Sequence, residues 1–128
     1  MGEVTPQQAP PVLTVQLVKD TFTLYLNHEP LTLPPKWVIF YTLLAVNHNR
    51  HISTDEVCDH HPWSRLTPDI AGRDLWRFTR KHEARHFGQR ITHSPSRQAT
   101  KLFTLLPEVT RHLTFQPDQA TVADHLRS

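Results

Sequence analysis

The spacing of apolar residues changes along this chain from two residues to about 3.6, and this change limits the folds that it can adopt. Apolar and polar residues alternate over residues 13–17 and again over 22–26, which predicts two short strands. Turn-forming residues at 27–30 lead to a third predicted strand at 31–33. We therefore expect the N-terminal third to form a small antiparallel meander.

Helical spacing begins after the prolines at positions 34 and 35, which end the meander and are tolerated in a first helical turn. Residues 37–46 are apolar nearly all round, a pattern typical of a buried helix. Ser53 and Glu56 have the spacing of a capping box and predict a short second helix that ends before Pro62.

A third helix is predicted to begin at Thr67 and Pro68, to run to about His86 and to end at Gly88. One face of this helix is expected to pack, and the other is basic. The expected packing positions are Ile70, Ala71, Leu75, Phe78 and His82. The exposed face is expected to carry Arg73, Arg77, Arg80, Lys81 and Arg85.

Residues 90–92 and 102–105 flank a polar loop and predict a hairpin with a basic tip. The expected fold class is α+β: a winged helix-turn-helix with an N-terminal antiparallel β-meander, three helices and a C-terminal β-hairpin wing. Residues 1–11 are expected to be a flexible tail, 12–106 the winged-helix domain and 107–128 a C-terminal extension with a short helix around 118–126.

Residues 13–106 resemble the DNA-binding output domain of OmpR-type response regulators, a family of bacterial transcription regulators. Residues 22–34 (FTLYLNHEPLTLP) are similar to the family's opening hairpin. The pairs Ile52-Ser53 and Glu56-Val57, with Trp63, are similar to its second helix and the following tryptophan. Residues 73–81 (RDLWRFTRK) are similar to its recognition helix.

Two departures from the family pattern limit what the resemblance implies. The sequence contains no receiver domain, so we expect no phosphorylation switch. The predicted wing, residues 92–100, has no glycine, whereas the family's wing closes with a glycine-rich turn. The wing therefore lacks the feature that implies family-style contact with the minor groove, and Arg97 and Lys101 are expected to contact phosphates instead.

Charge is unevenly distributed along the chain. Residues 65–101 hold nine Lys or Arg and three Asp or Glu, a net charge of +6, whereas the rest holds five and nine, a net charge of −4. A basic segment on a mildly acidic body is typical of a polyanion-binding protein. With a single cysteine, no secretory signal and no apolar run of membrane-spanning length, we expect a cytoplasmic protein without membrane contact.

The resemblance implies a transcriptional regulator that binds double-stranded DNA, with the third helix (about 68–86) in the major groove and the basic wing on the backbone. Arg73 and Arg77 are the expected base contacts. The expected backbone contacts are Arg80, Lys81, Arg90, Arg97 and Lys101. The alternative is a winged helix that binds another protein through Trp63, Trp76 or the C-terminal extension. A homodimer is compatible with either hypothesis.

Two patterns suggest metal chemistry, and we expect neither to bind metal. Residues 82–86 (HEARH) match the H-E-x-x-H motif of zinc peptidases. However, cations surround the motif, and no candidate third ligand lies at a spacing typical of a zinc site. Cys58, His60 and His61 form a second group, yet adjacent histidines rarely serve one tetrahedral site. We expect no enzymatic activity, no catalytic residue and no cofactor.

Overall fold

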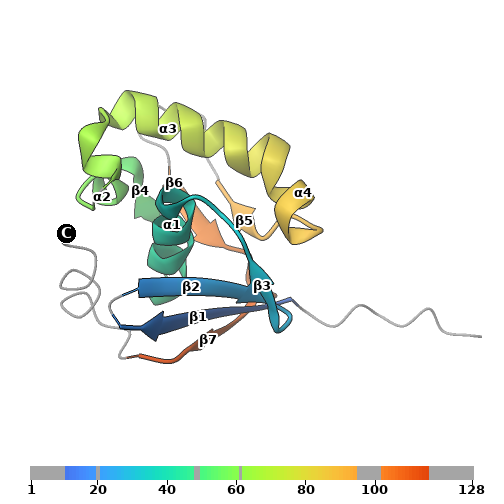
Figure 1. Ribbon diagram of the computed structural model, residues 1–128. Helices are drawn as coiled ribbons and strands as arrows, with labels where there is room; N and C mark the ends of the chain where they lie inside the picture. Colours follow the sequence, from blue (N-terminus) through green and yellow to red (C-terminus); the bar gives the residue numbers. More distant parts are fainter. Residues whose placement is uncertain (1–10, 20, 48–49, 61, 95–101, 116–128) are drawn as a thin grey trace, which may run out of the picture.

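The computed structural model describes residues 11–19, 21–47, 50–60, 62–94 and 102–115, which fold into a mixed α+β domain (Figure 1). The strands are β1 (Val12–Val18), β2 (Thr21–Leu26), β3 (Glu29–Leu31), β4 (Ile52–Ser53), β5 (Thr92–His93), β6 (Leu102–Leu105) and β7 (Thr110–Leu113). The helices are α1 (Pro35–Val46), α2 (Thr54–Val57), α3 (Pro68–Arg77) and α4 (Glu83–Phe87), with a 3₁₀ turn at Trp63–Arg65 and a π-helical turn at Phe78–His82.

One sheet has the strand order β3-β2-β1-β7. Strands β1 and β2 pair antiparallel with Leu13 opposite Leu26, and β2 pairs antiparallel with β3. Asn27 and His28 connect β2 to β3 with φ angles of 51° and 71°. Two successive positive φ values define the tight turn whose twist matches that of a hairpin. The meander expected from the alternating pattern is present.

A second sheet, with the order β4-β6-β5, consists of shorter strands, and both pairings are antiparallel. Phe103 of β6 lies opposite Ile52 of β4, and Leu105 lies opposite Thr92 of β5. The connection from β5 to β6 includes residues 95–101, which lie outside the described residues.

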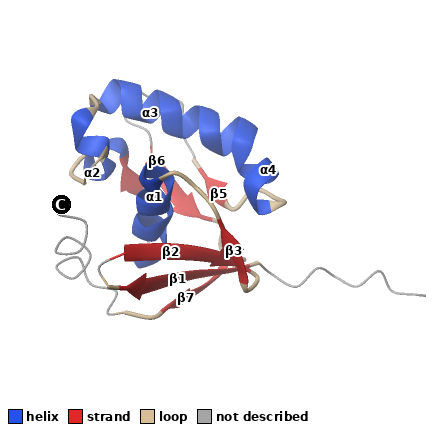
Figure 2. Ribbon diagram, in the orientation of Figure 1, coloured by secondary structure: helices blue, strands red, loops and turns tan. Residues whose placement is uncertain are grey.

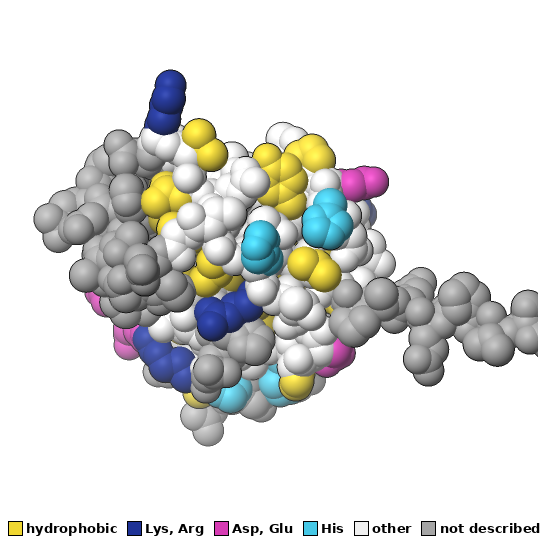
Figure 3. All heavy atoms as spheres, turned by 90° about the horizontal axis from the view of Figure 1, so that it is seen from below, with side chains coloured by type: hydrophobic (Ala, Val, Ile, Leu, Met, Phe, Trp, Pro, Cys, Tyr) yellow, Lys and Arg dark blue, Asp and Glu magenta, His cyan; other side chains and the backbone are white. Residues whose placement is uncertain are grey.

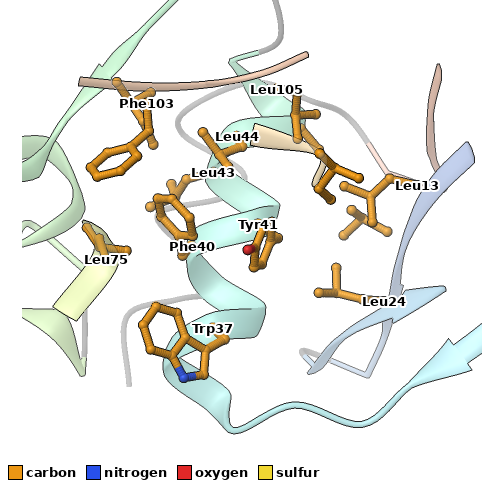
Figure 4. Packing of buried hydrophobic residues seen from close by; sticks show 14 of the residues in the cluster. Leu13, Leu24, Trp37, Phe40, Tyr41, Leu43, Leu44, Leu75, Phe103 and Leu105 are labelled. Atoms are coloured by element: carbon orange, nitrogen blue, oxygen red, sulfur yellow. The ribbon is translucent and has the colours of Figure 1, made fainter. Parts of the chain in front are cut away.

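Helix α1 lies between the four-stranded sheet and the other helices, and its side chains form the centre of the core (Figure 4). Phe40 and Tyr41 are fully buried. Leu13 and Leu24 of the sheet approach α1 from one side, whereas Leu75 and Phe103 approach it from the other. An all-round apolar helix is stable here because both of its sides are covered.

Several boundaries differ from those expected from the sequence, and the short strand β4 was not expected. Strand β3 spans Glu29–Leu31 rather than the predicted 31–33, because a two-residue turn is enough to reverse the chain. Residues 110–113, which we expected in a C-terminal extension, form β7 and pair parallel with β1. Arg111 of β7 also donates a hydrogen bond to the carbonyl oxygen of Ala45, near the end of α1. The expected tail at 1–10 and the expected helix around 118–126 lie outside the described residues.

Candidate nucleic-acid interface

Helices α3 and α4 and the π-turn between them form one continuous helical segment from Pro68 to Phe87, which we call the α3–α4 helix (Figure 2). The Thr67 side chain accepts a hydrogen bond from the backbone N–H of Ile70 and caps the start of the segment. Gly88 ends it in the left-handed conformation, with φ of 76°. The predicted limits of the third helix are confirmed.

The π-turn changes which residues of this segment face the core. The backbone N–H of Glu83 donates to the carbonyl oxygen of Phe78, five residues earlier, so the turn holds one residue more than an α-helical turn. In a regular α-helix, the residues seven and eleven positions after the buried Leu75, at 82 and 86, would lie on the packed face. With the extra residue, Glu83 and Phe87 take these places, and both are buried. The expectation that His82 packs in the core was wrong for this reason.

The same shift aligns the cations on the opposite side. Arg73 and Arg77 precede the π-turn, and after it the exposed positions in line with them are Lys81 and Arg85. All four side chains are exposed, and we call them the basic row. Arg80 is also exposed but lies beside the row, where its guanidinium group is 4.1 Å from the centre of the Trp76 ring.

Acidic side chains offset part of this charge, mainly at Asp69, which is exposed four residues before Arg73. Glu83 is fully buried and faces the core. Asp74 is 3.8 Å from the ammonium group of Lys36, and Asp69 lies in the first turn of α3. The α3–α4 helix lies on the side of the domain away from the four-stranded sheet (Figure 1). On the outer face of that sheet, Lys and Arg side chains are few (Figure 3).

The buried carboxylate of Glu83 joins three elements. Its Oε1 accepts hydrogen bonds from the backbone N–H groups of Ile91 at 2.7 Å and Thr92 at 3.0 Å. Its Oε2 accepts one from the hydroxyl of Tyr41 at 2.5 Å, and the Thr92 hydroxyl contacts both carboxylate oxygens. Glu83 therefore ties the α3–α4 helix to α1 and to β5, the first strand of the hairpin that follows it.

Burial raises the pKa of Glu83, since a desolvated carboxylate is less stable, and the surrounding donors oppose that effect. Tyr41 has a pKa well above its ordinary value, first because of burial and second because of the Glu83 charge. Tyr41 therefore remains protonated and donates to Glu83.

These contacts also show where the residues of the H-E-x-x-H motif lie. We expected Glu83 to lie among surface cations, but its carboxylate is buried and held by protein donors. His86 is exposed and stacks on Phe78, with ring centres 5.5 Å apart, and His82 is half-buried beside the same ring. Within the described ranges, no group of three His, Cys, Asp or Glu side chains is placed to hold a metal ion.

The second possible metal group lies after α2. Cys58 and His60 are half-buried there, and His61 lies outside the described residues. Burial raises the pKa of the Cys58 thiol and lowers the pKa of His60. Burial thus favours the neutral thiol over the thiolate that binds zinc.

The remaining predicted DNA contacts are Arg90, Arg97 and Lys101, which the sequence assigned to the wing and its flank. Arg90 is exposed between Gly88 and β5. Arg97 and Lys101, expected at the tip of the wing, lie outside the described residues. Trp63, proposed as a docking residue in the alternative hypothesis, is fully buried and donates its indole N–H to the carbonyl oxygen of Lys36. Its side chain is not available to a partner.

Comparison of the chain with models of protein families, with curated proteins and with solved structures finds no significant match. No helix in the described part of the chain is long and apolar enough to cross a bilayer.

Proposed function

We propose that this domain is a winged helix that binds double-stranded DNA and acts as a transcription regulator in the cytoplasm. The α3–α4 helix enters the major groove with the basic row toward the bases and the backbone. The observation that carries this proposal is the alignment of four exposed cations along one side of a helix whose other side is anchored in the core.

The order of elements supports the winged-helix assignment. The sequence of elements α1, β4, α2, α3–α4, β5 and β6, with β4, β6 and β5 in one small sheet, is the arrangement expected of that fold. The helix spans 20 residues, which corresponds to a length of about 30 Å. A helix of this kind fits the major groove, where each base pair presents a distinct pattern of donors and acceptors.

The position of each cation suggests its role. Arg73 and Arg77 lie in the first part of the α3–α4 helix and are assigned to base edges, where an arginine fork can bind guanine at two atoms. Lys81 and Arg85 continue the row, and Arg80 flanks it, so these three are assigned to phosphates. Arg85 was expected on the exposed face of the helix but was not among the predicted DNA contacts. Arg90 is also assigned to phosphate, and the predicted backbone contacts of Arg97 and Lys101 remain expectations.

The test is binding to mixed-sequence duplex DNA, measured by fluorescence anisotropy at low salt. Arg77→Glu and Lys19→Glu change the net charge by the same amount. Lys19 is exposed between β1 and β2, in the turn at one end of the four-stranded sheet. We expect Arg77→Glu to weaken binding at least tenfold and Arg77→Glu/Arg80→Glu to abolish it, whereas Lys19→Glu has little effect.

Equal weakening by Arg77→Glu and Lys19→Glu would show that only net charge matters and would overturn the proposed helix face. Absence of binding by the folded wild type would overturn DNA binding itself and favour protein docking. A single module buries about 600–1,000 Å² on DNA, so we expect tight binding to require a dimer or two adjacent sites.

A further inference from the structure

Ile70 is exposed on the same face of the α3–α4 helix as two arginines of the basic row. Among the described residues only Ile70 and Val18 are large hydrophobic side chains with substantial exposure, at 45% and 55%. Ile70, Arg73 and Arg77 have the spacing i, i+3 and i+7 within the regular part of α3, so they share one side of the helix. The sequence pattern had placed Ile70 in the core.

The position of Ile70 is fixed by the local structure. Its backbone N–H is held by the Thr67 cap, and the next residue, Ala71, is fully buried. Ile70 therefore lies in the first turn of α3 and faces away from Leu75. In helix-turn-helix proteins the first turns of the recognition helix reach the base edges.

We propose that Ile70 contacts the 5-methyl group of a thymine in the major groove and so helps to determine the sequence that this protein binds. The inference rests on the proposed DNA-binding function and adds a preferred base to it. The thymine methyl is the apolar feature of the major-groove edge, and an exposed branched apolar side chain is its natural partner. The surrounding cations of the basic row make a protein partner with an apolar surface a poorer match for this position.

The spacing along the helix sets the expected order of bases. Ile70 and Arg73 are separated by about 4.5 Å along the helix axis, and Arg73 and Arg77 by about 6 Å. Successive base pairs are about 3.4 Å apart. The preferred site is thus expected to hold a thymine within one or two base pairs of the guanine bound by Arg73. A second guanine, bound by Arg77, follows about two base pairs further on.

The experiment begins with selection of duplexes from a random library by the wild type, Ile70→Ala and Val18→Ala. Val18 is the matched control, because it is also an exposed branched apolar residue but lies at the end of β1. Each selected thymine is then replaced by deoxyuridine, which removes only the methyl group. We expect one such replacement to weaken wild-type binding about fourfold, from the burial of one methyl-sized group.

The same replacement is expected to leave the affinity of Ile70→Ala unchanged, while its preference for guanine persists. Val18→Ala should behave as the wild type does. The inference is wrong if the wild type and Ile70→Ala select the same thymine, or if no deoxyuridine replacement affects the wild type more than Ile70→Ala. In either case salt-dependent binding would leave the proposed function intact. Failure of the wild type to bind any duplex would overturn both.

Discussion

Replacement of Glu83 by alanine is predicted to destabilise the domain strongly. The substitution removes the acceptor for two backbone N–H groups, at Ile91 and Thr92, and for the Tyr41 hydroxyl. A buried donor that loses its partner costs about 1–3 kcal/mol. Loss of the unfavourable desolvation of the carboxylate partly compensates for this. We therefore expect the free energy of unfolding to fall by about 3 kcal/mol, near the lower end of the summed cost of the three donors that lose their acceptor.

Glu83→Gln provides the matched control. Its amide oxygen keeps the bonds from Ile91 and Thr92, and its NH₂ group is able to donate to the hydroxyl oxygens of Tyr41 and Thr92. We expect this variant to lose only about 1 kcal/mol, the value of one ordinary hydrogen bond.

Urea unfolding followed by tryptophan fluorescence measures both values, since Trp37 and Trp63 are buried. A domain of this size has a total stability of about 5–15 kcal/mol, so a loss of 3 kcal/mol is easily resolved. If alanine and glutamine variants are equally stable, or if Glu83→Ala matches the wild type, the carboxylate does not join the three elements as described.

Further predictions concern pH, a helix cap and a helix end. The pKa of Glu83 is raised in the folded state. The contribution of the Glu83 side chain to the free energy of unfolding is therefore complete below the ordinary Glu pKa and is lost as the pH rises through the raised pKa. The unfolding free energy of the wild type relative to Glu83→Gln should therefore fall as the pH rises above the ordinary Glu pKa, and a difference that does not change with pH would contradict this. Ser53→Ala removes the hydroxyl that accepts from the Glu56 N–H and should cost about 1 kcal/mol in urea unfolding; no loss would show that the cap is unimportant. Gly88→Ala should cost about 1–2 kcal/mol from the positive φ alone, because an added Cβ meets no atom within 4 Å; a loss above about 3 kcal/mol would indicate a steric clash instead.

Much of the fold follows from patterns that depend only on local sequence. The alternating residues of β1 and β2, the all-round apolar α1 and the Ser53–Glu56 capping box are all found where the sequence predicts them. These patterns are informative because the burial of each element repeats with the period of its backbone.

The π-turn and β7 were not predicted, for different physical reasons. A π-turn leaves no composition signal, and it shifts the packed positions by one residue, from His82 and His86 to Glu83 and Phe87. A glutamate is not expected in a core, so its burial became evident only from its partners on α1 and β5. Strand β7 has no fully buried residue and pairs with a strand almost 100 residues earlier, and such a pairing is not encoded locally.

For the candidate interface, composition and spacing identified Arg73, Arg77, Arg80 and Lys81, all of which are exposed on the α3–α4 helix. The alignment of Arg85 with the row and the exposure of Ile70 required the structure. Arg85 joins the row only because of the extra residue in the π-turn. Ile70 was assigned to the core because α-helical spacing alone does not show where the edge of the packed face lies.

The most direct test of DNA binding through the basic row is the dependence of affinity on salt for the wild type and for single alanine variants of the proposed phosphate contacts. The four described contacts, Arg80, Lys81, Arg85 and Arg90, predict a slope of about −3.6 for log K against log salt, or steeper if the hairpin tip contributes. Each alanine substitution among the four should reduce the steepness by about 0.9, whereas Lys19→Ala should not change it. A slope near zero, or one that responds equally to Lys19→Ala, would contradict binding of DNA through this face of the α3–α4 helix.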